Sequence, residues 1–136
     1  MNTLADSPAT APLHSPEAAA ATLRTFFRIA QAWALSNDEQ QRLLGCRRSS
    51  FFAWKAGRIK SGLDDATLER LSHLFGIYAA LQILLPIPER ANAWIRKPNS
   101  APLFGGGTAL QRMLGGQVAD LFVVRQYLDA QRGGWA

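Results

Sequence analysis

Residues 34–58 read ALSNDEQQRLLGCRRSSFFAWKAGR and predict two short helices joined by a tight turn. Ser36 and Glu39 have the S-x-x-E spacing of a capping box, in which each side chain accepts a hydrogen bond from the other residue's backbone N–H at a helix start. Gly45 is expected to end the first helix, because glycine enters the left-handed backbone conformation cheaply. A second helix is expected over roughly residues 47–56. This arrangement is typical of a helix-turn-helix.

The charges around this motif are distributed as expected for a surface that binds DNA. The chain holds 15 Lys/Arg and 10 Asp/Glu residues, a formal net charge of +5. Between Glu39 and Asp64, however, six residues are basic and none is acidic. In a helix-turn-helix the second helix enters the major groove, where arginine reads guanine and a phenyl ring contacts the thymine methyl group. We therefore expect DNA contacts from Arg42, Arg47, Arg48, Ser49, Ser50, Phe52, Lys55, Arg58 and Lys60.

The expected roles within this set differ. Near the start of the second helix, base edges would be reached by Arg48, Ser49, Ser50 and Phe52. The basic residues farther away would contact phosphates. Arg47 stands where many such motifs have a Ser or Thr cap, so the helix starts either later, at Ser49, or without a side-chain cap. The alternatives to DNA binding are a solvated basic face and an ordinary helical packing unit.

Helical spacing of apolar residues continues along the rest of the chain, so the predicted fold class is all-α. The segment 64–85 is apolar over more than one face, so it either runs through the middle of the protein or also forms a dimer seam. The last helix is expected to bury Phe122 and to end at Gly133–Gly134. Besides the helix-turn-helix, helices are expected over residues 17–34, 64–85, 88–96, 108–114 and 117–131.

Residues 94–110, WIRKPNSAPLFGGGTAL, form a glycine-rich elbow (the elbow). A phosphate-binding loop needs a preceding strand and a following lysine, and a dinucleotide fingerprint needs a βαβ unit; the elbow has neither. Thr108 and Gln111 form a second capping box. The glycines are therefore expected to bend the chain, so that helix 108–114 folds back on helix 88–96.

Length and composition limit the other possibilities. The 136 residues suffice for one compact domain or two small helical units. Residues 1–16 hold three of the seven prolines and are expected to form a flexible arm. No secretory signal and no apolar run near the ~18 residues of a membrane helix is present, so we expect a cytoplasmic protein without membrane contact. Cys46 is the single cysteine, which excludes an intramolecular disulfide.

Catalytic and metal-binding patterns are also missing from the sequence. His14 and His73 have no second ligand at metal-binding spacing. The paired carboxylates Asp64 and Asp65 sit at an expected helix start, and no Ser/His/Asp or Cys/His set accompanies them. We expect a protein without enzymatic activity, cofactor or metal.

Four segments in this order resemble the MbcA/ParS/Xre antitoxin family: LLGCRRSSFFAWKAG, LERLSHLFGIYAALQILLP, ANAWIRKPNSAPLFGG and DLFVVRQYLDAQRGGW. The resemblance runs from about residue 20 onward. It implies an Xre-like helix-turn-helix domain, residues 17–86, and a helical toxin-binding domain, residues 87–136. It also implies an antitoxin that represses its own operon and neutralises a RES-domain toxin. Such a toxin is an enzyme that attacks NAD or uses it to modify a target. One departure is Ala109, where the family often has proline.

The resemblance assigns toxin binding to the C-terminal half. We expect the end of the chain to block the toxin, with Trp135 in a ring slot of the NAD pocket and Asp129 paired with phosphate-binding arginines. A homodimer is expected, because operators of such motifs have two half-sites about one turn apart. The alternative is a stand-alone regulator whose C-terminal unit dimerises or senses a small molecule. The expected toxin contacts are Trp94, Pro98, Asn99, Leu103, Gly105, Gly106, Arg125, Tyr127, Asp129, Arg132 and Trp135.

Overall fold

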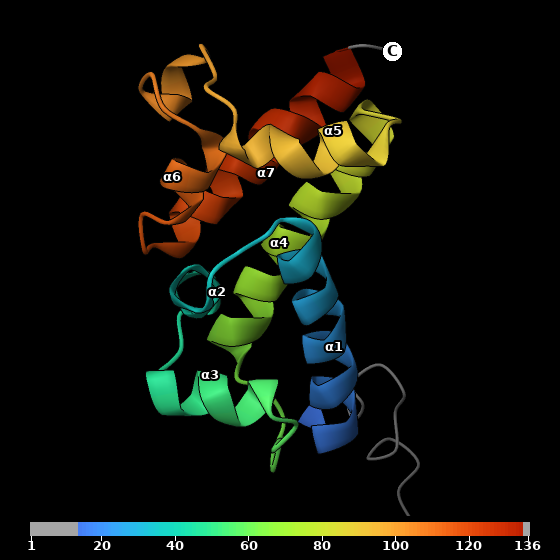
Figure 1. The fold of residues 1–136 in the computed structure, drawn as a ribbon, viewed down its shortest axis with the longest axis vertical. Coiled ribbons are helices and arrows are strands. Elements are labelled where there is room, and N and C mark those ends of the chain that lie inside the picture. Colours follow the sequence, from blue (N-terminus) through green and yellow to red (C-terminus); the bar gives the residue numbers. More distant parts are fainter. Residues whose placement is uncertain (1–13, 135–136) are drawn as a thin grey trace, which may run out of the picture.

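The computed structural model describes residues 14–134, and among these residues the regular structure is helical apart from one isolated bridge (Figure 1). The predicted all-α class is confirmed. The first half consists of α1 (Pro16–Ala32), α2 (Asn37–Leu44), α3 (Arg48–Lys55) and α4 (Asp65–Leu84). The second half consists of α5 (Pro88–Ala93), the 3-10 helices η3 (Trp94–Arg96) and η4 (Pro102–Phe104), α6 (Ala109–Met113) and α7 (Val118–Gly134).

The predicted helix-turn-helix is present as α2 and α3. The Ser36 amide donates to Glu39 Oε1 at 2.8 Å, and the Glu39 amide donates to Ser36 Oγ at 3.1 Å, so the capping box is complete. Gly45 ends α2 with a φ of 65°. The cap of α3 is Arg47, whose side chain makes no capping hydrogen bond, so α3 starts at Arg48 and the second of the two sequence alternatives is correct.

Helix α4 runs through the middle of the protein. Its most extensive contact is with α7, which lies along it, while α1 and α2 cover its first half (Figure 1). Leu74 and Ile77 of α4 are fully buried, as are Leu121 and Val124 of α7. The second apolar face of α4 is therefore covered by α7 within the same chain. Helix α4 can thus be apolar over more than one face without a second subunit to cover it.

Three details of the second half differ from the sequence expectations. The segment 88–96 is divided into α5 and η3, and α7 does not stop before its glycines but continues to Gly134. Glycine weakens a helix by only about 0.5–1 kcal/mol, which lowers helix stability at a chain end without ending the helix. Phe122 was expected to be buried and is 48% exposed, because the buried stripe of α7 follows Leu121, Val124 and Leu128 and Phe122 lies beside it. No helix among residues 14–134 combines the length and apolarity needed to cross a membrane.

Candidate DNA-binding and partner-binding sites

The outward face of α3 carries the residues expected to read bases. Arg48 is exposed, and its guanidinium carbon lies 4.9 Å from the centre of the Phe52 ring. Phe52 is half-buried because it packs edge-on against the buried Phe51, at 5.1 Å between ring centroids. Arg48 also lies 3.9 Å from Asp38 at the start of α2. Such an exposed ion pair is worth about 0–1 kcal/mol, so Asp38 holds Arg48 only weakly.

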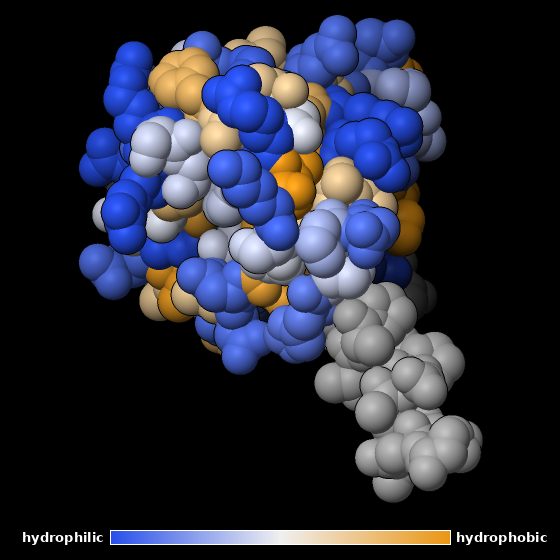
Figure 2. Space-filling model, turned by 90° about the horizontal axis from the view of Figure 1, so that it is seen from below, coloured by the Kyte–Doolittle hydropathy of each residue, from blue (hydrophilic) through white to orange (hydrophobic). Residues whose placement is uncertain are grey.

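The basic residues around α3 are accessible at this end of the molecule. Figure 2, viewed from below Figure 1, shows a face that is mostly hydrophilic with scattered hydrophobic side chains. Lys55, at the last turn of α3, donates to Asn37 Oδ1 and lies 5.6 Å from the Phe51 ring. The exposed members of the expected set are Arg42, Arg47, Arg48, Ser49, Lys55, Arg58 and Lys60, and the half-buried ones are Ser50 and Phe52.

Arg42 differs from the other expected DNA contacts. Its Nε donates to the carbonyl of Leu114, after α6, at 2.7 Å. This carbonyl lies in the second half, 72 residues along the chain. Arg42 therefore connects α2 to the turn between α6 and α7 while its side chain remains exposed.

The turn between α2 and α3 is held by polar contacts around the single cysteine. Gln41 Nε2 donates to the Cys46 carbonyl at 3.1 Å. Burial raises the pKa of the Cys46 thiol, which favours the protonated and poorly nucleophilic form.

Hydrogen bonds from Thr67 lower the pKa of Asp64, the cap of α4, so that its carboxylate stays charged at the helix start.

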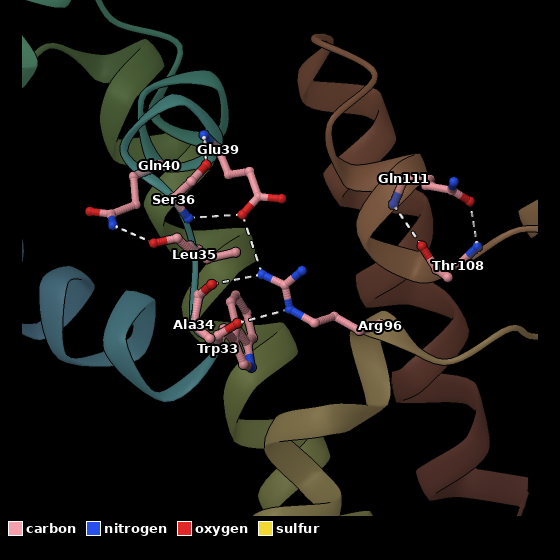
Figure 3. A network of polar contacts seen from close by, with 9 residues as sticks. All are labelled: Trp33, Ala34, Leu35, Ser36, Glu39, Gln40, Arg96, Thr108 and Gln111. Carbon is pink, nitrogen blue, oxygen red and sulfur yellow. Dashed lines mark hydrogen bonds and ion pairs between the residues drawn. The ribbon is translucent and has the colours of Figure 1, made fainter.

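The elbow is a closed and ordered loop. The Asn99 amide donates to the Gly107 carbonyl at 2.9 Å, next to the bridge between Pro98 and Thr108. Gly105 and Gly106 have φ values of 58° and 85°, in the left-handed region that favours glycine. The second predicted capping box, of Thr108 and Gln111, is also present (Figure 3). The glycines thus turn the chain back into α6, which contacts η3 as the sequence predicted.

An aromatic cluster joins the elbow to α7. The Trp94 and Tyr127 rings stack at 6.4 Å with an interplanar angle of 19°, and the buried Phe104 meets both rings edge-on. Trp94 and Tyr127 are half-buried, so both pack within the chain and part of each side chain stays accessible. Nearby, Leu103 is half-buried and its carbonyl accepts from Arg112 Nη1 at 2.9 Å. A shallow cleft of about 70 Å³ is lined by Leu81, Leu84, Leu85, Trp94, Tyr127, Leu128 and Gln131.

The charged residues of α7 that were expected to contact a toxin pair with one another. Asp129 lies 3.8 Å from Arg125 Nε and 3.9 Å from Arg132 Nη1. Arg125 also donates to the Ser72 carbonyl on α4 at 3.2 Å. Asp129 remains half-exposed and could still receive a partner's cation. Trp135 lies outside the described residues.

Two arginines make long-range contacts that the sequence does not predict. Arg96 of η3 donates to backbone carbonyls in the turn between α1 and α2, and Arg70 of α4 donates to the Gly116 carbonyl at 3.0 Å. No local pattern marks either residue, because each acceptor is a main-chain carbonyl 46 or more residues away. Among residues 14–134, no group of His, Cys, Asp and Glu could hold a metal ion.

The geometry defines a class: a helix-turn-helix protein whose second helical half offers a closed elbow and a partly exposed aromatic cluster. Residues 12–76 match the antitoxin Xre-like helix-turn-helix domain, and residues 80–134 match the antitoxin Xre/MbcA/ParS C-terminal toxin-binding domain. The uncharacterized protein y4oB of Sinorhizobium fredii is 55% identical over 117 residues, which cover 84% of this chain and 86% of that protein. The chain belongs to the Xre/MbcA/ParS antitoxin family.

Family membership confirms the resemblance seen in the sequence. The protein is an antitoxin of a toxin–antitoxin system, with a helix-turn-helix for DNA and a domain for a toxin partner. This domain composition is typical of a non-enzymatic regulator. The two matched regions meet inside α4, between residues 76 and 80, so one continuous helix belongs to both.

Proposed function

We propose that this antitoxin neutralises a RES-domain toxin, one that consumes NAD or uses it for ADP-ribosylation, and represses its own operon. The observation that carries this proposal is the separation of two surfaces. Helix α3 lies at one end of the molecule, and the elbow and the end of α7 lie toward the other (Figure 1). A toxin bound at the second end would leave α3 free for operator DNA, so one chain could serve both partners.

The end of the chain is the proposed inhibitory element. Helix α7 continues to Gly134, and its last turn lies at the end of the molecule away from α3 (Figure 1). An NAD pocket accepts flat rings and an anionic pyrophosphate. The tryptophan at position 135 has the ring for such a slot, and Asp129 has the charge for the phosphate-binding arginines. The proposed contact set also includes the elbow residues Pro98, Asn99, Leu103, Gly105 and Gly106.

The test is co-expression with the product of the neighbouring gene, followed by size analysis and an NAD consumption assay. Deleting residues 135–136 leaves the described part of α7 intact, and we expect this variant to bind DNA normally but to lose neutralisation. A central aromatic anchor would be worth about 2–4 kcal/mol of binding free energy. Full protection of NAD by the shortened chain at equal concentration would show that inhibition lies in the elbow or in α7 itself.

We further propose a homodimer on the operator. Two copies of α3 would occupy two half-sites about one helical turn apart. Light scattering at micromolar concentration should give twice the mass of the 14.9 kDa chain, and a monomer without half-site symmetry in footprints would contradict this. The stand-alone regulator remains the second candidate, and a neighbouring protein that fails to co-purify with this chain would favour it.

A further inference from the structure

The side chain of Arg96 crosses from the toxin-binding half, residues 80–134, to the start of the helix-turn-helix (Figure 3). Its Nε donates to the Trp33 carbonyl at 3.2 Å, and its Nη2 donates to the Ala34 carbonyl at 2.8 Å. The same Nη2 lies 3.3 Å from Glu39 Oε1. Arg96 thus contacts the end of α1, the turn after it and the first turn of α2.

These acceptors belong to a turn with an unfavourable backbone conformation. Ala34 has a φ of 54°, a conformation that costs a non-glycine residue roughly 1–2 kcal/mol. The carbonyls at the end of α1 also carry the negative end of the helix dipole, which favours a cation there. A planar guanidinium can donate to both carbonyls at once, whereas an ammonium ion acts as a point charge.

Arg96 also acts on the cap of α2. Glu39 Oε1 accepts the Ser36 amide at 2.8 Å and Arg96 Nη2 at 3.3 Å, so one oxygen closes the capping box and holds the arginine. Only 25% of the Glu39 side chain and 42% of the Arg96 side chain are exposed, so this pair is better shielded than Arg48–Asp38. The start of α2 is therefore fixed by a residue of η3.

The other end of α2 is held from the same half. Arg42 donates to the Leu114 carbonyl, and Arg70, which donates to the Gly116 carbonyl, lies directly against Gly45 at the end of α2. Helix α2 sets the position of α3 through their short turn. Besides its packing on α4, α2 is therefore linked to the toxin-binding half at both ends, at its second end by Arg42 directly and through Arg70.

We propose that Arg96 is a positioning residue for DNA binding. Operator recognition would then depend on a side chain of the toxin-binding half that does not itself contact DNA. This inference rests on the proposed DNA binding by α3. A base-reading arginine needs its helix held in register, whereas non-specific phosphate contacts tolerate a small shift of α2 and α3. Loss of Arg96 should therefore reduce specific binding more than non-specific binding.

The experiment compares wild-type protein with Arg96→Gln, Arg96→Lys and Arg90→Gln on two DNA fragments, one from upstream of the protein's own gene and one of random sequence. Arg90 is an exposed arginine of α5, and its side chain has no hydrogen bond or ion pair within the described part of the chain, so Arg90→Gln controls for lost charge. Affinities are measured well below the melting temperature of each variant. A second measurement follows amide hydrogen exchange at Leu35, Ser36 and Glu39 in the free protein.

We expect Arg96→Gln to lose roughly 5- to 20-fold in affinity for the upstream DNA and about 2-fold for random DNA. The variant loses a charge-assisted hydrogen bond, and only part of that lost free energy lowers the affinity for DNA. Arg96→Lys should recover part of the specific affinity, and Arg90→Gln should match wild type within about 2-fold on both fragments. Exchange at Ser36 should accelerate in Arg96→Gln and not in Arg90→Gln.

Equal losses for Arg96→Gln and Arg90→Gln on both fragments, or unchanged exchange at Ser36, would overturn the positioning role while leaving DNA binding intact. Wild-type protein that binds the upstream fragment no better than random DNA would overturn the operator part of the proposed function, and the positioning role with it. The wild-type comparison therefore separates the two failures.

Discussion

At the scale of single residues, the two basic side chains of α3 should differ in what they contribute to DNA binding. Arg48 lies over Phe52 and next to Asp38 near the start of the helix, where base edges are in reach. Lys55 lies at the other end of the helix, paired with Asn37. The stacking on Phe52 holds the Arg48 guanidinium in a restricted orientation, which should reduce the entropy cost of the base contact proposed for it.

We predict that Arg48→Ala weakens operator binding by about 1–3 kcal/mol and relaxes specificity at one base pair. Lys55→Ala should weaken binding to all sequences about equally and reduce the slope of affinity against salt concentration by about one unit, since it removes one phosphate contact. Competition binding against a set of single-base operator variants at several salt concentrations tests both. Equal loss on operator and random DNA for Arg48→Ala would remove its assignment as a base reader.

At the scale of elements, the turn between α2 and α3 depends on Gly45 for two reasons. Its φ of 65° is strained for any other residue, and an added Cβ would lie against the guanidinium of Arg70. Arg70 would have to move and would weaken its bond to the Gly116 carbonyl. The turn of the helix-turn-helix is therefore packed against the second half.

Gly45→Ala should lower the free energy of unfolding by about 1–3 kcal/mol, and Gly57→Ala provides the matched control. Gly57 has a φ of 83° but open space around it, so its substitution adds backbone strain alone. We expect Gly45→Ala to be the more destabilising by roughly 0.5–1.5 kcal/mol, the value of one hydrogen bond. Urea unfolding measures both variants, and equal losses would mean that the Arg70 contact contributes nothing.

At the scale of the whole molecule, the two halves share one body because α4 packs against both. His73 lies in this contact: its side chain is 14% exposed, its ring meets Phe122 edge-on at 5.8 Å, and Nε2 is 3.9 Å from Glu69. Burial, and then the positive charge of Arg125, lower the pKa of His73 below 6.5, while Glu69 opposes the shift. The folded state therefore binds this proton less readily than the unfolded state.

The sign of the pH dependence follows from this shift. The contribution of His73 to stability is complete above about pH 6.5 and is lost as the pH falls from there through the lowered pKa of the folded state. We predict that the free energy of unfolding decreases less between pH 7.5 and pH 5 in His73→Gln than in wild type. The exposed His14, substituted the same way, serves as the control. Parallel curves for wild type and His73→Gln would contradict the assignment.

Local chemistry in the sequence determined the helices, both capping boxes, the left-handed glycine turns and the basic motif of α2 and α3. These features need only residues within about four positions of one another, which is why spacing alone predicted them. The continuation of α7 through its glycines was not predictable in this way, because glycine lowers helix stability without ending a helix. The exposure of Phe122 likewise depended on which stripe of α7 meets α4.

Only the tertiary structure decided how the two halves are joined. The partner of α4 on its second apolar face is α7, and periodicity alone could not distinguish this intramolecular cover from a second subunit. The contacts of Arg42, Arg70 and Arg96 are with main-chain carbonyls 46 to 72 residues away. Every residue has the same backbone carbonyl, so the sequence does not show which carbonyls will accept a hydrogen bond from an arginine. That choice is made only when folding places a helix end opposite the arginine.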